Sequence, residues 1–257
     1  MNNRKRFTFS ALSIILSLGV MTYAQDSISA LDIMRKVDTK ALPKDITAKV
    51  TMNLIDTKGN VRERTLKQYR RSDTKLIMWF TSPADVKGTS MLRLSYNDRD
   101  DDTWIYLPAF GKVRRIASSA KTGSFMGSDF TYEDMETKKI DNYTYMLLRS
   151  EMIDDKDCYV IETTPKQDVT SDYSKSTVWI DKTSFYPVRS ELYHKSGKLK
   201  KVMHASIKKH GQYWLPEKIT MKDARTQHTT VMISENIIVD TELSDALFKT
   251  TEMTRIR

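Results

Sequence analysis

A period-two alternation of apolar and polar residues is the feature that most constrains the fold of this chain. After Asp45, apolar residues occupy every second position from Ile46 to Leu54, and Thr, Lys or Asn stands between them. Because successive side chains of a strand point to opposite faces, the pattern predicts a β-strand with one buried face. Roughly ten strand-like segments follow one another along the chain, separated by short turn sequences. The chain should therefore fold as a mainly β protein.

Several other segments depart from simple alternation. Residues 61–71 carry four arginines and few apolar side chains, which favours an outer or edge strand. Residues 75–81 form a continuous apolar run, typical of a strand that is buried on both faces. We expect one N-terminal helix near residues 29–37, capped by Ser27 or Ser29.

Two further short helical turns are predicted. The first covers residues 130–135 and is capped by Ser128 or Asp129, and the second follows Ser244. No internal repeat, linker or second domain is apparent. Strands at this spacing favour one antiparallel sheet curled on itself, because closure or covering helices remove exposed strand edges. A flat sandwich is the alternative, but strands with one apolar and one charged face favour an incomplete barrel around an apolar interior.

The N-terminus indicates the compartment. Arg4, Lys5 and Arg6 precede a short apolar run from Ala11 to Val20, and the small residues around Ala24 suit cleavage. This pattern predicts a secretory signal peptide at residues 1–24 and one mature domain at residues 25–257. Loss of those three basic residues lowers the formal charge from +9 by three, to +6. We expect a periplasmic protein that contacts anionic lipids or acidic proteins, and no nucleic acid.

The stretch from Trp104 to Glu136 combines three different compositions. An aromatic strand ends at Pro108, a basic group at residues 112–115 follows, and small polar residues then surround Phe125 and Met126. A loop of that composition has too little apolar surface to fold alone. Two apolar side chains within it are difficult to explain as core, and they predict a lid over a hydrophobic site.

Residues 107–115 and 125–130 of this stretch read LPAFGKVRR and FMGSDF. They resemble the signature of a bacterial family of outer membrane lipoprotein-sorting proteins, which are LolA-like periplasmic carriers. The resemblance continues in residues 178–201, 213–224 and 245–248 and covers most of the mature chain. It implies a LolA/LolB-like half-barrel with a few short covering helices and an apolar cavity. It also implies an inner-membrane lipid-exporting transporter as donor and an outer-membrane acceptor.

Catalytic signatures are missing from the sequence. There is no Gly-x-Ser-x-Gly elbow, no His-Glu-x-x-His helix and no phosphate-binding glycine loop, so we predict a protein that is not an enzyme and needs no cofactor. The four histidines have no metal-site spacing. The acidic residues at 98 and 100–102 lack the pattern of a calcium loop and are interpreted as a solvated turn. The single cysteine, Cys158, begins an apolar strand and is interpreted as inert core.

Two groups of residues are candidates for binding. The first could line a hydrophobic site and provide its lid, although packing alone would explain most members. It consists of Met78, Trp79, Phe80, Leu92, Leu94, Trp104, Tyr106, Phe125 and Met126. The second, which could dock on an anionic headgroup or partner, is Lys112, Arg114 and Arg115.

These features predict a non-enzymatic carrier that holds the acyl chains of a lipoprotein or envelope lipid in a hydrophobic cavity during transfer towards the outer membrane. The alternative is a structural or interaction module of an envelope or efflux complex that carries no lipid. The sequence leaves open the cargo, the donor and acceptor, the direction of transfer, the oligomeric state and whether the lid moves.

Overall fold

The computed structural model describes residues 28–255, which form one antiparallel sheet and a few helical turns. The expected signal peptide lies outside the described residues. The sheet has 13 strands in the order β6-β5-β4-β3-β2-β1-β13-β12-β11-β10-β9-β8-β7. Their bounds are β1 Ile46–Ile55, β2 Val61–Arg71, β3 Lys75–Ser82, β4 Ser90–Leu94, β5 Asp102–Leu107, β6 Lys112–Arg115, β7 Tyr143–Ile153, β8 Lys156–Pro165, β9 Tyr173–Asp181, β10 Pro187–His194, β11 Leu199–His210, β12 Tyr213–Asp223 and β13 Thr229–Val239.

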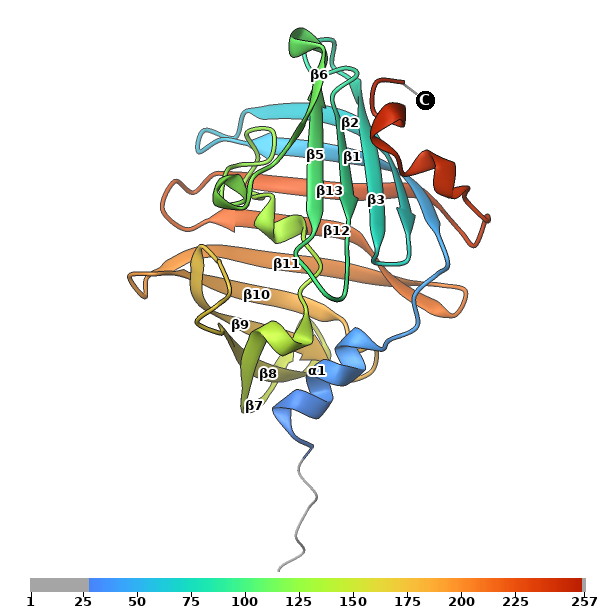
Figure 1. The fold of residues 1–257 in the computed structure, drawn as a ribbon. Coiled ribbons are helices and arrows are strands. Elements are labelled where there is room, and N and C mark those ends of the chain that lie inside the picture. Colours follow the sequence, from blue (N-terminus) through green and yellow to red (C-terminus); the bar gives the residue numbers. More distant parts are fainter. Residues whose placement is uncertain (1–27, 256–257) are drawn as a thin grey trace, which may run out of the picture.

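The sheet consists of two meanders joined at one place. Strands β1–β6 and β7–β13 each pair with their neighbours in sequence, and β1 pairs with β13 to connect the two sets. The sheet is strongly curled, so that β3–β6 cross in front of β1, β2 and β11–β13 (Figure 1). Within residues 28–255 no ladder joins β6 to β7. The expected incomplete antiparallel β-barrel is therefore confirmed.

Two local expectations need correction. β2 is not an edge strand, because it pairs with β1 on one side and β3 on the other. The strands at the two ends of the sheet are β6 and β7. The turn after residue 130 is a single 3-10 turn at Glu133–Met135. Its start is fixed by Thr131 and Asp134, whose side chains each accept a hydrogen bond from the other's backbone N–H, and not by Ser128 or Asp129.

The helix α1, Ala30–Asp38, begins where the sequence predicted. The Ser29 hydroxyl accepts a hydrogen bond from the backbone N–H of Asp32, which satisfies one of the free donors at the helix start. Ala30 and Ile33 are buried against Ile161, Val178 and Ile180 of the sheet. α1 therefore covers the β8–β9 end of the half-barrel.

The two faces of the sheet have separate apolar cores. The inner face carries one cluster centred on β1 and β3 and another that includes residues of β9, β10 and β12, and Met232 packs against both. The outer face of β3–β5 is also apolar and is covered by the C-terminal segment through Leu247, Phe248 and Met253. β3 is consequently buried on both faces, as its continuous apolar run predicted.

The junction of the two meanders is fixed by Asp45, which is 1% exposed. Its carboxylate accepts hydrogen bonds from the Thr241 backbone N–H and hydroxyl, each at 2.8 Å, and from the Leu243 N–H at 2.9 Å. Burial opposes ionisation of this carboxyl, but those hydrogen bonds outweigh burial, so its pKa is lowered. The charged form of Asp45 therefore stabilises the folded state.

Replacing Asp45 with Asn should lower the free energy of unfolding by about 2 kcal/mol at neutral pH, because an amide N–H₂ would meet a backbone donor. The folded-state pKa lies below the unfolded one, so the stabilisation is present above the unfolded pKa and is lost as pH falls through the folded pKa. Urea denaturation at neutral and acidic pH measures the loss of unfolding free energy in Asp45→Asn, with the exposed Asp98→Asn as the control. An equal loss at both pH values would contradict the assignment.

Candidate functional site

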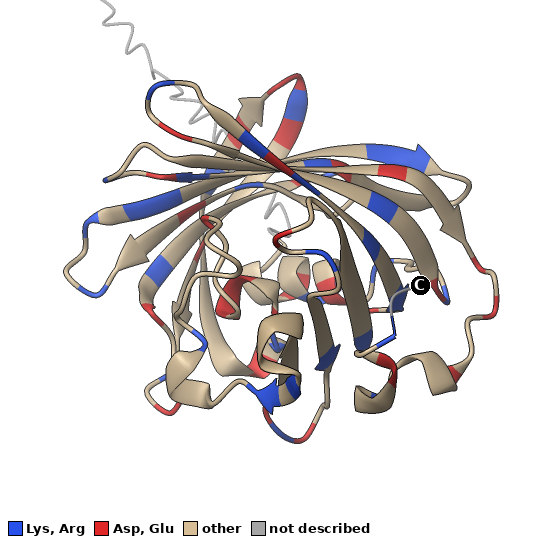
Figure 2. Cartoon of the chain, turned by 90° about the horizontal axis from the view of Figure 1, so that it is seen from above, with Lys and Arg blue, Asp and Glu red and all other residues tan. Residues whose placement is uncertain are grey.

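Residues 117–136, called the inner segment here, follow the edge strand β6 and pack on the inner face of the sheet through Phe125 and Phe130. Figure 2 shows that loops and short helical turns fill the space inside the curve of the sheet. The segment folds back on itself as a narrow loop. The Phe125 N–H donates to the Phe130 carbonyl at 2.7 Å, and the Glu133 N–H donates to the Lys121 carbonyl at 2.9 Å. Lys121 and Glu136 also form an ion pair at 2.6 Å. The two ends of the loop are thus held together.

Phe125, near the tip of the loop, is completely buried. Its ring lies 5.9 Å from the ring of Phe80 and 5.8 Å from that of Tyr132, measured between centroids, within the inner-face cluster. Our expectation that Phe125 is not a core residue is therefore wrong. Local composition did not reveal the apolar wall of the sheet against which this polar loop packs.

The rest of the inner segment fills the other half of the interior. Phe130 packs in the second inner cluster with Tyr173 and Leu192. Asp134 forms an ion pair with Lys201 at 2.9 Å and accepts a hydrogen bond from the Tyr173 hydroxyl at 2.7 Å. Burial raises the pKa of the Asp134 carboxyl, but Lys201 and these hydrogen bonds lower it more, so the net shift is downward. The expected apolar cavity is thus occupied by the chain itself.

Polar contacts attach the tip of the inner segment to the sheet. The Arg64 guanidinium of β2 donates to the carbonyl of Met126, whose φ of 51° lies in the left-handed region that a non-glycine residue seldom adopts. The Asp129 N–H donates to the Thr230 hydroxyl at 2.9 Å, and the Asp129 carboxylate contacts His228 at 2.7 Å. β2 and β13 therefore hold a strained tip against the apolar wall.

Methionine is concentrated on this interior surface. Eight of the 14 methionines of the chain belong to the two inner clusters or pack against them. Six lie on strands of the sheet, and two lie on the inner segment that covers it: Met52, Met78, Met91, Met203, Met221 and Met232, and Met126 and Met135. The thioether side chain is flexible and polarisable, and it adapts to ligands of irregular shape. The composition suits a surface that packs against more than one occupant.

The structure divides the nine predicted lining residues between two faces. Met78, Phe80, Phe125 and Met126 lie in or against the inner cluster. The other five lie on the outer face against the C-terminal segment and cannot line the same interior: Trp79, Leu92, Leu94, Trp104 and Tyr106. The cause is cross-strand register, which places Ile77, Leu92 and Trp104 in one row across β3, β4 and β5. The roles of the inner four in lipid binding and as a lid remain predictions.

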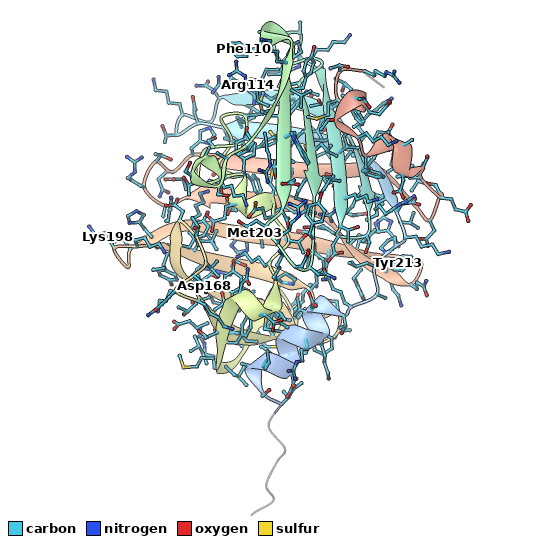
Figure 3. All side chains as sticks on the ribbon, viewed as in Figure 1. Phe110, Arg114, Asp168, Lys198, Met203 and Tyr213 are labelled. Carbon is cyan, nitrogen blue, oxygen red and sulfur yellow. The ribbon has the colours of Figure 1, made fainter. Side chains whose placement is uncertain are left out.

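The predicted docking residues lie on the edge strand β6, and Phe110, which sequence reasoning did not single out, lies next to them. Lys112 and Arg114 are exposed, and the Arg114 guanidinium lies 5.2 Å from the centre of the Phe110 ring. Phe110 is 59% exposed at the tip of the β5–β6 hairpin (Figure 3). Arg115 differs because it forms an ion pair with Asp102. The one signal for Phe110 was its position in a turn, between Pro108 and Gly111.

The acidic residues near position 100 are not all part of a solvated turn. Asp101 and Asp102 are buried. Asp102 forms ion pairs with both Arg115 and Arg99, the latter at 2.8 Å, so two arginines balance its negative charge. Among residues 28–255 no group of three or more His, Cys, Asp or Glu side chains is arranged to hold a metal ion. Cys158 is buried, and burial raises the pKa of its thiol to about 11, consistent with an inert core position. No helix in the described range has the length and apolarity to cross a membrane.

These features define a class of protein, an incomplete antiparallel β-barrel with an apolar inner face covered by its own chain. A family model described as an uncharacterized protein matches residues 72–255. A DUF1329 family protein from Desulfovibrio piger is 31% identical, with a TM-score of 0.82 over 87% of this chain and 97% of that protein. The chain belongs to the DUF1329 family.

Two further solved structures have the same fold. A putative outer membrane lipoprotein-sorting protein domain from Vibrio parahaemolyticus is 31% identical, with a TM-score of 0.81 over 88% of this chain and 98% of that one. A LolA superfamily protein from Nitrosomonas europaea is 23% identical, with a TM-score of 0.68 over 88% and 99%. The resemblance to outer membrane lipoprotein-sorting proteins is thereby confirmed. No protein of curated function matches the chain.

Replacing Phe125 with Ala should lower the free energy of unfolding by about 3 kcal/mol, because it leaves a cavity in a fully buried cluster. Met126→Ala is the matched control in the same tip, and its half-buried side chain should lose about 1 kcal/mol. Chemical denaturation of both variants measures the difference. A smaller loss for Phe125→Ala than for Met126→Ala would show that the inner segment does not pack inside the sheet in solution.

Proposed function

We propose that this protein is a non-enzymatic periplasmic carrier that shields the acyl chains of a lipoprotein or envelope lipid during transfer. The observation that carries the proposal is the methionine-rich inner face, which one polar loop covers by inserting Phe125 and Phe130. Withdrawal of the loop exposes two connected apolar clusters. The 31% identity to a putative outer membrane lipoprotein-sorting protein domain supports the same conclusion.

The free energy gained by burying an acyl chain can exceed the free energy lost when Phe125 leaves the interior. Removing Phe125 from its cluster costs about 3–5 kcal/mol, as for a buried phenylalanine truncated to alanine. An acyl chain with about 14 methylenes gains about 11 kcal/mol from burial, at about 0.8 kcal/mol per methylene. Part of that gain offsets the ordering of the chain and the lost polar contacts of the loop tip. Burial of a long acyl chain can therefore offset the loss of Phe125 from its cluster, whereas burial of a short one cannot.

The contacts that close the interior are suited to opening. Arg64, Thr230 and His228 bind the loop tip through polar groups, and water can replace such hydrogen bonds at modest net cost. The strained backbone of Met126 relaxes when the tip leaves. Phe125 and Met126 thus act as a lid that also fills the site, and Met78 and Phe80 form the wall behind it.

The exposed hairpin tip is the proposed docking surface for an anionic headgroup or partner. Phe110 presents an apolar ring next to the free charges of Lys112 and Arg114, a combination that suits a membrane interface or an acidic protein surface. The edge strand β6 leads directly into the inner segment. Docking of an inner-membrane transporter or outer-membrane acceptor there places the partner on the hairpin that precedes the lid in the chain.

A disulfide between the lid and the sheet tests the carrier. The side chains of Asp129 and Thr230 touch at 2.7 Å, so an Asp129→Cys, Thr230→Cys double variant should cross-link them. The oxidised protein should fail to take up a fluorescent palmitoyl lipid from vesicles, and reduction should restore uptake because the lid can then leave. The Asp129→Cys single variant is the control for loss of the native contacts.

Native mass spectrometry of the wild-type protein purified from the periplasm completes this test. A co-purifying lipid mass supports the carrier. Equal uptake by the oxidised and reduced double variants would contradict the lid. An empty interior together with a stable protein partner would favour the alternative, a structural or interaction module without lipid cargo.

The Lys112→Gln, Arg114→Gln double variant should bind vesicles containing anionic lipid roughly thirtyfold more weakly, at about 1 kcal/mol per basic residue. The matched control is Lys195→Gln, Lys198→Gln, which removes two exposed charges from a turn distant from the hairpin tip (Figure 3). Vesicle sedimentation at low and high salt measures both. If both variants weakened binding equally, the effect would come from net charge alone, and the hairpin tip would not be a docking surface.

A further inference from the structure

β7 is a long edge strand of the sheet. It pairs with β8 along its length, and it is the last strand of the sheet, so no strand within residues 28–255 lies on its other side. Its free edge presents unpaired backbone N–H and carbonyl groups to solvent, and such edges bind a further strand unless they are blocked.

The side chains of β7 do not block pairing. Met152 is 64% exposed, Met146 is 54% exposed and Leu148 is 39% exposed, which places three large apolar side chains in solvent on one strand. The register with β8 shifts between Leu147 and Arg149 and leaves Leu148 outside that ladder. From Leu148 to Met152, therefore, an apolar residue stands at each end of the polar group Arg149, Ser150 and Glu151.

The other edge of the sheet is constructed in the opposite way. β6 has only four residues, and three of them are the basic Lys112, Arg114 and Arg115. Two antiparallel copies of β6 would oppose like charges in every register that pairs three or four residues, which is destabilising. Short, charged edges are a common protection against association. β6 has this protection, whereas β7 is long and carries charges of both signs, and its one bulge, at Leu148, leaves Arg149 to Ile153 in regular register.

The sequence of β7 is complementary to itself when it is read in the opposite direction. In an antiparallel pair centred on Ser150, Arg149 of one copy lies opposite Glu151 of the other, and Met152 comes level with the bulge at Leu148. Arg149 and Glu151 lie close enough on one face to form an ion pair at 2.5 Å within the strand. Pairing two copies brings both pairs together as four alternating charges, flanked by two apolar contacts.

We propose that this chain forms a two-fold symmetric dimer through its β7 edges, with Ser150 at the axis. Such an interface is isologous, since the same surface serves both copies, and it continues the sheet of one molecule into that of the other. The pairing covers Leu148 and Met152 and satisfies the free backbone groups between them. It is independent of whether the protein carries lipid, because the inner segment and the β6 hairpin take no part in it.

Charge reversal tests the register. The Arg149→Glu variant places Glu opposite Glu151 at two positions, and Glu151→Arg places Arg opposite Arg149, so each should raise the dimer dissociation constant roughly a hundredfold. An equimolar mixture of the two variants restores opposite charges at both positions and should form a heterodimer. The Arg149→Glu, Glu151→Arg double variant should dimerise by itself. Sedimentation velocity of the purified protein over a wide concentration range measures all four samples.

Recovery in the mixture separates a contact between chains from an effect on folding, because mixing changes no chain. Both positions are also at least partly exposed, so the single variants should retain the wild-type circular dichroism spectrum. Monomeric wild-type protein at every concentration would overturn the proposal. A dimer that survives both single reversals, or variants that do not associate when mixed, would overturn it equally.

A cysteine at the axis gives an independent measurement. Ser150→Cys should form an intermolecular disulfide under mild oxidation, because the proposed axis places residue 150 of one copy opposite residue 150 of the other. Ser196→Cys, in an exposed turn elsewhere, is the control, and the native Cys158 is buried. Non-reducing electrophoresis should show a dimer for Ser150→Cys alone. Equal cross-linking of both variants would indicate random collision and would overturn the assigned axis.

Discussion

The pairing of β1 with β13 is the interaction on which the rest of the structure depends. It joins residues 46–55 to residues 229–239 in nearly continuous register, and it is the link that turns two separate meanders into one sheet. Its closure requires the two ends of the domain to meet, which is entropically costly before the contacts form. The buried Asp45 fixes that meeting by binding the chain immediately after β13. The curvature that encloses an interior follows from this join.

The position of the lid follows from the same topology. Because β1 and β13 meet in the middle of the sheet, the strands at its two ends are β6 and β7, which are consecutive in sequence. The chain between them therefore has to cross the opening of the half-barrel. Residues 116–142 make that crossing, and the inner segment within them buries Phe125 and Phe130 against the inner face. A connection that other β-proteins would keep short thus becomes the cover of the apolar interior.

Local patterns predicted much of this fold, and pairing order accounts for what they missed. The alternation of Ile46 to Leu54 correctly indicated one buried face, and the run at residues 75–81 correctly indicated two. The sequence could not indicate that Trp79 and Trp104 share the outer face with the C-terminal segment, because that depends on register between strands. Phe125 was placed wrongly for a related reason. The composition of a loop describes its own solubility and says nothing of the wall against which it folds.

The ion pair between Lys121 and Glu136 holds the two ends of the inner segment together. Burial raises the pKa of the Glu136 carboxyl, so its charged form depends on Lys121, and a pair of this kind contributes specificity more than stability. By joining the two ends of the loop, it allows the tip to leave the apolar wall while the base stays closed. A polar cavity of about 210 Å³ lies beside the pair, lined by Thr137, Asn142 and Asp168 among others. Tyr132 and Met135 at the base pack against the inner cluster, so when the base stays in place, opening of the tip withdraws only Phe125 and the groups that hold Met126.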